Sequence, residues 1–144
     1  MTENNLPLID SNILIYSVDS SDVKKHTKAK FLLKNCWSGK TKFAVSIQNL
    51  SEFFVNATKK IENPLSKEIG ESIVKNIIKF DGFVKIKPNE STILKAMKIS
   101  KGEEMNYWDA LIEATMIENN IFCIYTENVK DFKSKRIKVV NPLI

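Results

Sequence analysis

The sequence is poor in the side chains that most often carry catalysis or bind transition metals. Its two cysteines, Cys36 and Cys123, are far apart, and its one histidine is His26. A zinc site built from Cys and His ligands therefore cannot be assembled within one chain. A Ser–His or Cys–His catalytic pair would have to use His26, which lies in the lysine-rich segment 24–28. We therefore expect any hydrolytic chemistry to depend on carboxylates.

Residues that interrupt a chain are also scarce. Four glycines and four prolines are spread along 144 residues, and no repeat or low-complexity tract lies between them. We therefore expect a single domain over residues 1–144. No apolar run approaches the ~20 residues of a membrane span, and the polar segment 1–7 does not resemble a signal peptide. These absences predict a cytoplasmic protein with no membrane segment.

Arginine is almost missing from a basic chain. Of 22 basic residues only Arg136 is an arginine, against 17 acidic residues, and the formal net charge is +5. A modest excess of lysine fits a nucleic-acid partner. It fits a lysine-rich solvated surface equally well, so charge alone does not choose between them.

Short apolar runs alternate with longer amphipathic stretches, which is the pattern of βα units and a parallel sheet. Strands are predicted over residues 6–9, 43–45, 83–86, 122–125 and 137–140. Helices are predicted over residues 12–16, 23–37, 47–60, 69–80, from 89 onward and over 107–118, with a polar loop over 101–106 and a loop or short helix over 126–132. We therefore predict an α/β fold, a three-layer α/β/α sandwich around a parallel sheet of about five strands.

Two acidic residues stand in apolar company in the first half of the chain. Asp10 follows Leu8 and Ile9 at the carboxyl end of a predicted strand, which is the edge where open α/β sheets bind ligands. Asp10 could equally cap the helix that follows. Glu52 lies on the flank of the apolar stripe of helix 47–60, where an exposed side chain is the structural alternative. The inward positions predicted for that helix are Ile47, Leu50, Phe54 and Ala57.

Two further carboxylates lie in the apolar helix 107–118. Asp109 is in its first turn, where burial of the charge would be costly unless it is paired or bound to metal. The favourable interaction of an acid with a helix N-terminus is the alternative explanation. Glu113 is four residues further on and therefore on the same face, so the two carboxylates repel unless a cation lies near them. Glu113 could also point to solvent.

Together, these carboxylates could converge on one edge of a parallel sheet. A cluster of oxygen ligands suits Mg²⁺ or Mn²⁺. Such ions activate water and neutralise charge on a phosphodiester transition state. The sequence therefore predicts a metal site of this type, on the condition that the segments meet.

Four segments in this order resemble the motifs of PIN-domain proteins, and specifically the VapC-like toxin ribonucleases. Residues 8–16 read LIDSNILIY, an apolar strand followed by Asp-x-Asn and an apolar helix. Residues 46–54 read SIQNLSEFF and residues 107–114 read YWDALIEA, each with its acid in a helix. Residues 125–132 read YTENVKDF and are followed by Val140-Asn141-Pro142. The resemblance covers essentially the whole chain.

This resemblance implies a metal-dependent endoribonuclease that cleaves RNA phosphodiesters. Asp10, Glu52 and Asp109 would be the catalytic and metal-binding residues for Mg²⁺ or Mn²⁺, while Asn12 and Thr126 would orient them. The resemblance also implies a homodimer and a cognate antitoxin protein that blocks the site.

The sequence departs from the family pattern at one position. The family often has a fourth acid two residues after the threonine, where this chain has Asn128. Asn128 itself is then a weaker ligand, and Glu127, Asp131 or Glu113 would compensate. A catalytically inactive PIN-like binding module is therefore one alternative. A phosphate-handling α/β domain, either a receiver or a haloacid-type phosphatase, is another, although such phosphatases need an acid where Asn12 stands.

Overall fold

A computed structural model describes residues 6–144, and their strands form one parallel sheet. The strand order is β3-β2-β1-β4-β5, and every adjacent pair is parallel. The strands are β1 (Leu8–Ile9), β2 (Phe43–Ser46), β3 (Phe83–Ile86), β4 (Cys123–Tyr125) and β5 (Lys138–Val140). The predicted five-stranded parallel sheet is therefore confirmed. Residues 1–5, part of the polar segment contrasted above with a signal peptide, lie outside the described residues.

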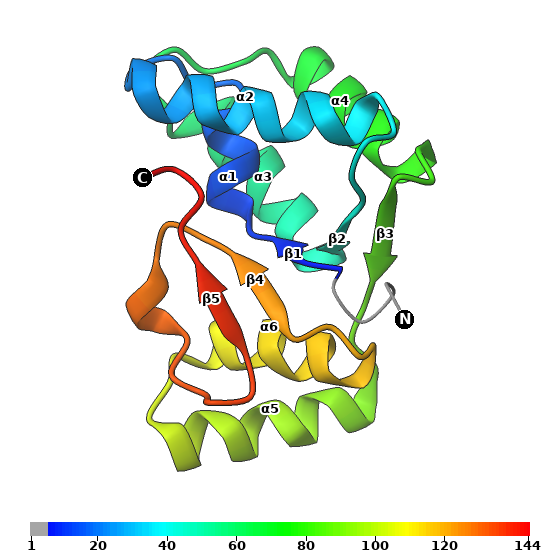
Figure 1. Ribbon diagram of the computed structural model, residues 1–144, viewed down its shortest axis with the longest axis vertical. Coiled ribbons are helices and arrows are strands. Elements are labelled where there is room, and N and C mark those ends of the chain that lie inside the picture. The colour runs from blue at the N-terminus through cyan, green and yellow to red at the C-terminus, as the bar shows by residue number, and fades with distance from the viewer. Residues whose placement is uncertain (1–5) are drawn as a thin grey trace.

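Helices cover both faces of the sheet, which completes the predicted three-layer sandwich (Figure 1). They are α1 (Ser11–Tyr16), α2 (Val23–Trp37), α3 (Ile47–Lys59), α4 (Lys67–Lys79), α5 (Glu90–Glu103) and α6 (Tyr107–Glu118), with a 3-10 turn η2 (Val129–Asp131). Adjacent side chains of a strand point to opposite faces. Leu8 accordingly packs in the core with α5 and α6, and Ile9 packs in the core with α1 to α4. Within residues 6–144, no helix is both long and apolar enough to cross a membrane.

Two local predictions are wrong. The loop predicted from residue 101 begins later, because α5 continues to Glu103 with Gly102 inside the helix. The chain turns at Glu104, whose left-handed φ of 52° brings the following N–H, that of Met105, to the Ser100 carbonyl at 3.1 Å. Ile47, predicted to face inward, is 47% exposed. Ile47 is the first residue of α3, directly after β2. Phe53, which was not among the predicted inward positions, is buried in the core.

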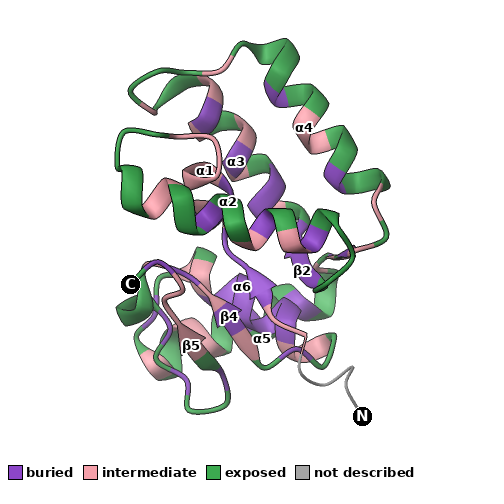
Figure 2. Cartoon of the chain, turned by 45° about the horizontal axis from the view of Figure 1, so that its top comes forward, coloured by how far each residue is buried: buried purple, intermediate pink, exposed green. Residues whose placement is uncertain are grey.

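Helix α6 is buried on nearly all sides because it lies between the sheet and α5. Its residues Ala110–Met116 are all buried, as the purple ribbon in Figure 2 shows. The Asn106 side chain caps the helix by accepting from the Trp108 N–H at 2.9 Å. The buried length of α6 holds its first turn, which carries Asp109, at a fixed place beside the sheet.

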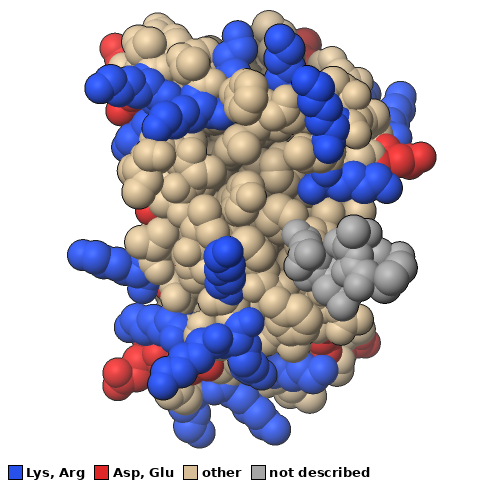
Figure 3. Space-filling view, in the orientation of Figure 1, with Lys and Arg blue, Asp and Glu red and all other residues tan. Residues whose placement is uncertain are grey.

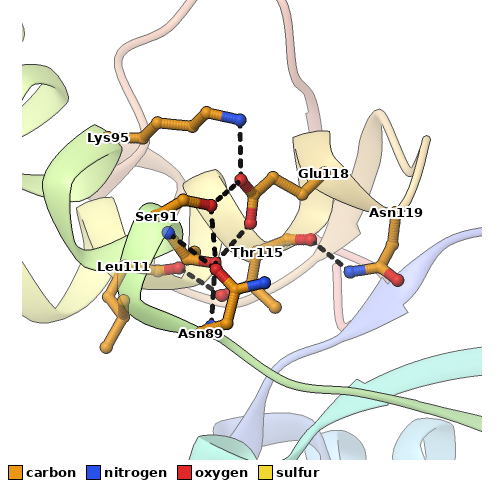
Figure 4. A network of polar contacts seen from close by, with 8 residues as sticks. Asn89, Ser91, Lys95, Leu111, Thr115, Glu118 and Asn119 are labelled. Carbon is orange, nitrogen blue, oxygen red and sulfur yellow. Dashed lines mark hydrogen bonds and ion pairs between the residues drawn. The ribbon is translucent and has the colours of Figure 1, made fainter.

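A polar network ties the far end of α6 to the start of α5 (Figure 4). The Glu118 carboxylate accepts hydrogen bonds from Ser91 at 3.2 Å and from Thr92, and it pairs with Lys95 at 2.6 Å. The hydrogen bond from Lys95 is the main cause that holds the pKa of Glu118 below its ordinary range. This network resists sliding of α6 along α5, and it therefore helps to fix the position of Asp109 at the opposite end.

Candidate functional site

The sheet has its topological switch point between β1 and β4. From β1 the sheet is extended by β2 and β3 on one side, and after α5 and α6 the chain returns to place β4 and β5 on the other side. Open α/β sheets bind ligands in the crevice beyond the strand ends at such a point. Ile9 is paired with Tyr125, so the residues that follow them, Asp10 and Thr126, lie side by side there.

Asp10 accepts hydrogen bonds from two distant segments of the chain and from its own turn. One carboxylate oxygen accepts from the Ser11 N–H at 2.8 Å and from Asn49 Nδ2 at 3.1 Å. The other accepts from Thr126 Oγ1 at 2.8 Å. Burial raises the pKa of Asp10 above its ordinary value, and these hydrogen bonds only partly oppose the shift. Asp10 also caps α1, so its structural and proposed functional uses coexist.

Asn12 and Thr126, the two orienting residues suggested by the resemblance, contact each other. Asn12 Nδ2 donates to Thr126 Oγ1 at 3.1 Å, and Asn12 Oδ1 accepts from the Glu127 N–H at 3.1 Å. Thr126 in turn donates to Asp10. This chain of hydrogen bonds fixes the Asp10 carboxylate relative to the end of β4.

Sequence reasoning missed Asn49, which is fully buried beside Asp10. Asn49 forms a capping box with Ser46: its Oδ1 accepts from the Ser46 backbone N–H at 3.2 Å, and its own N–H donates to Ser46 Oγ at 3.0 Å. These bonds aim Asn49 Nδ2 at Asp10. The Ser-x-x-Asn spacing after a strand was the available signal for the cap, but it does not indicate the contact with Asp10.

The structure brings Asp109 close to three other carboxylates. Burial and then, in decreasing order of effect, the charges of Asp131, Asp10 and Glu52 together raise the pKa of Asp109 from 3.8 to about 6. Burial and the Asp10 charge likewise raise the pKa of Glu52. The predicted trio of Asp10, Glu52 and Asp109 is therefore grouped at the switch point, with Asp131 as a fourth acid.

Asp131, rather than Asn128, supplies the fourth charge to this group. Asn128 is exposed, and its N–H donates to Thr126 Oγ1 at 3.1 Å. Its side chain makes no capping hydrogen bond to η2. The η2 turn begins after Asn128 and ends at Asp131, whose charge acts on both Asp10 and Asp109.

Three other residues considered from the sequence point elsewhere. Glu113 is fully buried near Glu103 of α5, and it pairs with Arg136 at 3.8 Å. Glu127 accepts from the Tyr16 hydroxyl at 2.9 Å and pairs with Lys25. His26 Nδ1 lies 2.7 Å from the Tyr16 carbonyl oxygen, in a contact that stabilises the start of α2. The structure therefore does not bring Glu113 or Glu127 to the group around Asp10.

The donor chemistry of this group fits Mg²⁺ or Mn²⁺. All its side chains offer oxygen, and the mutual repulsion seen at Asp109 is what a divalent cation would relieve. Across the described part of the chain, no three Asp, Glu, His or Cys side chains already stand at the spacing of a metal-ligand set. Binding of an ion would therefore require rotation of these side chains toward one another.

The sequence profile of the PIN domain matches residues 8–138. The chain belongs to the PIN-domain family. The resemblance drawn from the sequence motifs is thereby confirmed, and the phosphate-handling alternative is set aside. No curated protein sequence gives a significant match.

Solved structures of similar fold include three of toxins or toxin–antitoxin complexes. A toxin–antitoxin complex from Klebsiella pneumoniae is 23% identical, with a TM-score of 0.65 over 94% of this chain and 97% of that chain. VapC20 of Mycobacterium tuberculosis, a toxin that cleaves the sarcin–ricin loop, is 14% identical, with a TM-score of 0.62 over 83% of this chain and 87% of that chain. VapBC2 of Rickettsia felis, bound to a DNA fragment from its promoter, is 17% identical, with a TM-score of 0.63 over 93% of this chain and 96% of that chain. At these identities the comparisons establish a shared fold.

Proposed function

We propose that this PIN-domain chain is a Mg²⁺- or Mn²⁺-dependent endoribonuclease and the toxin of a toxin–antitoxin pair. Membership of the family supports nuclease chemistry. The single observation that carries the proposal is the grouping of Asp109 with Asp131, Asp10 and Glu52 at the switch point, where their charges raise the pKa of Asp109. A group of like charges is unfavourable by itself, so its placement at a ligand-binding edge favours a cation-dependent function.

The residues of the site divide into ligands and supports. Asp10, Glu52 and Asp109 would hold the ion, and Asp131 would add charge beside it. Thr126, Asn12 and Asn49 hold Asp10 in one orientation through their hydrogen bonds. A bound Mg²⁺ or Mn²⁺ would make a water more nucleophilic and neutralise charge that builds on the phosphate.

Lysine-rich surfaces support RNA as the substrate. The formal net charge is +5, and on the face shown in Figure 3 lysine and arginine side chains project from both ends of the molecule. Cations on the surface attract the phosphate backbone without sequence preference. RNA binding by this chain should therefore weaken as salt rises.

The proposed partners follow from the structural neighbours. One neighbour is a toxin–antitoxin complex, and another is a VapBC2 complex on promoter DNA. We extend this by proposing a cognate antitoxin protein and a homodimer for the present chain, with action in the cytoplasm.

Substitution of Asp10 tests the enzymatic proposal. Asp10→Asn keeps a side chain that caps α1 but removes the charge, so Mn²⁺-dependent cleavage of an unstructured RNA should fall by at least about 100-fold. The melting temperature should change little. Asp22→Asn is the matched control, because Asp22 caps α2 in the same way by accepting from the Lys25 N–H, away from the site. Cleavage retained by Asp10→Asn, or absent from the wild-type protein, would contradict the proposal.

A further inference from the structure

Trp108 is a large aromatic side chain left exposed next to the carboxylate group. It immediately precedes Asp109 in the first turn of α6, and 60% of its surface is accessible. Single exposed apolar residues are common and need no explanation by themselves. What distinguishes Trp108 is its place, because it adjoins the residue on which the charges of three other acids act.

The surroundings of Trp108 hold its backbone and one edge of its ring while leaving much of the side chain open. The Tyr107 ring packs against it edge to face, with centroids 5.3 Å apart at 74°. The backbone N–H of Trp108 donates to Asn106 Oδ1, and the backbone carbonyl of Trp108 accepts from Gln48 Nε2 at 3.3 Å. Gln48 belongs to α3, the helix that carries Glu52. The Trp108 backbone is thereby tied to both helices that supply acids to the site.

Trp37, the other tryptophan, provides an internal contrast. It lies at the end of α2, and its ring packs against Phe80 and Phe83 with centroid distances of 5.0 and 5.1 Å. Its exposure is 40%, and its two aromatic contacts account for its position. In residues 6–144, Trp108 has one such aromatic contact, with its own chain neighbour Tyr107.

We propose that Trp108 is a substrate-binding residue on which an unpaired RNA base stacks beside the phosphate to be cleaved. This inference rests on the proposed ribonuclease function. An exposed indole can stack on a base only where that base is free of its own neighbours, so it selects single-stranded or looped RNA over a duplex. Every base has a π-face, so stacking here confers preference for unpaired structure with little preference for sequence.

Charge near α6 supports RNA as the occupant of this surface. The Lys133 ammonium donates to the Glu104 carbonyl at 3.2 Å, just before α6 begins. A cation therefore lies beside the short segment that leads from α5 into α6. One RNA strand could therefore make three contacts on this surface: a base on Trp108, a phosphate near Asp109 and a flanking phosphate near a lysine.

Fluorescence can test the stacking directly, because the chain has two tryptophans. Each variant is made in the Asp10→Asn background, so that RNA binds without being cleaved, and is titrated in Mg²⁺ with a short unstructured RNA. With Trp37→Phe, the emission comes from Trp108 and should be quenched by RNA. With Trp108→Phe, the emission comes from Trp37 and should stay unchanged. Equal quenching of the two variants would overturn the proposal.

Affinity and oligomeric state complete the test. Trp108→Ala should weaken binding of the unstructured RNA by roughly tenfold, and Trp108→Phe by less, because phenylalanine keeps a stacking face. Binding of a blunt duplex should not change.

If the wild-type protein cleaves RNA and Trp108→Ala retains the wild-type RNA affinity and KM, the stacking role fails and the ribonuclease proposal stands. If sedimentation shows that Trp108→Ala dissociates a dimer without changing RNA affinity, Trp108 is a subunit contact and the stacking role also fails. If neither cleavage nor RNA binding is observed with the wild-type chain, both proposals fail.

Discussion

Asp109 and Glu113 lie one turn apart on α6, yet they belong to different environments. Burial is the main cause that raises the pKa of both carboxyls. For Asp109 the next causes are the charges of Asp131, Asp10 and Glu52 at the edge of the sheet. For Glu113 the next cause is Glu103, and the neighbouring Ser134 and Arg136 partly offset the shift. The same helix therefore presents one acid to a ligand-binding edge and the other to a closed core.

The difference follows from their distance to the end of the helix. Asp109 is in the first turn, where α6 emerges at the carboxyl ends of the strands and remains partly accessible. Glu113 is one turn deeper in α6, where it is fully buried near Glu103 of α5. Within residues 6–144, neither Glu113 oxygen has a hydrogen-bond partner, and the guanidinium of Arg136 is 3.8 Å away. Helical spacing alone places both acids on one face but does not indicate where that face becomes closed.

The largest expected effect is on RNA cleavage, which should depend on Asp109 and not on Glu113. Asp109→Asn should lower Mn²⁺-dependent RNA cleavage by at least about 100-fold, because it removes a proposed ligand. Glu113→Gln, which makes the same chemical change one turn away, should keep cleavage within about twofold of wild type, as expected for a residue outside the site. Cleavage rates and melting temperatures are measured on the same preparations. A large loss in both variants, with both folded, would remove the functional distinction between them.

The raised pKa of Asp109 predicts pH-dependent metal binding. A protonated carboxyl must release its proton to bind an ion, so affinity for Mn²⁺ should fall by up to about tenfold per pH unit below the Asp109 pKa of about 6. Affinity should level off above pH 7. Calorimetry in two buffers of different ionisation enthalpy measures the protons released. In Asp109→Asn this proton release should decrease, whereas in Glu113→Gln it should stay as in wild type.

A matched pair of substitutions can move the fourth charge of the group from position 131 to position 128. Asp131→Asn should weaken Mn²⁺ binding by about two- to fivefold, the effect of an exposed charge near the ion. Asn128→Asp should strengthen it by a similar factor. The double variant should therefore bind with an affinity close to that of wild type. If Asn128→Asp leaves the affinity unchanged, position 128 lies outside the site.

The smallest effect concerns the stability of the core around Glu113. Its pKa is raised above the ordinary value of 4.5, so the folded protein holds this proton more tightly than the unfolded chain does. Stability contributed by the neutral acid is therefore lost as pH rises through the raised pKa. Glu113→Gln removes this loss, and it should raise the melting temperature by roughly 2–4 °C at pH 8 with no gain near pH 4. A constant difference across this range would contradict the assignment.

Much of the fold could be predicted because hydrophobic pattern and position agree. Short apolar runs before Asp10 and before Thr126 form neighbouring parallel strands, as expected. The roles proposed for Asp10, Glu52 and Asp109 depended on their motifs, and the fold groups these acids at one edge. The end of α5 could not be predicted, because it depends on a left-handed Glu104 rather than on Gly102.

The parts of the site that could not be predicted depend on contacts between distant segments. Asn49 reaches Asp10 across 39 positions of sequence, and its capping box alone gives no sign of this contact. Glu113 is next to Arg136, the one arginine of the chain, only because β5 follows the segment that packs on α6. Asp131 acts on Asp109 from the last position of the η2 turn, whereas Asn128 precedes that turn and carries no charge.

The metal site at the switch point can be tested by a calorimetric Mn²⁺ titration of wild type, Asp10→Asn and Glu113→Gln at pH 7.5. Wild type and Glu113→Gln should show saturable binding with the same affinity and stoichiometry. Binding to Asp10→Asn should be at least about tenfold weaker, since that variant loses a charged ligand. Equal binding to Asp10→Asn, or no binding to the folded wild-type protein, would contradict a metal site at the switch point of the sheet.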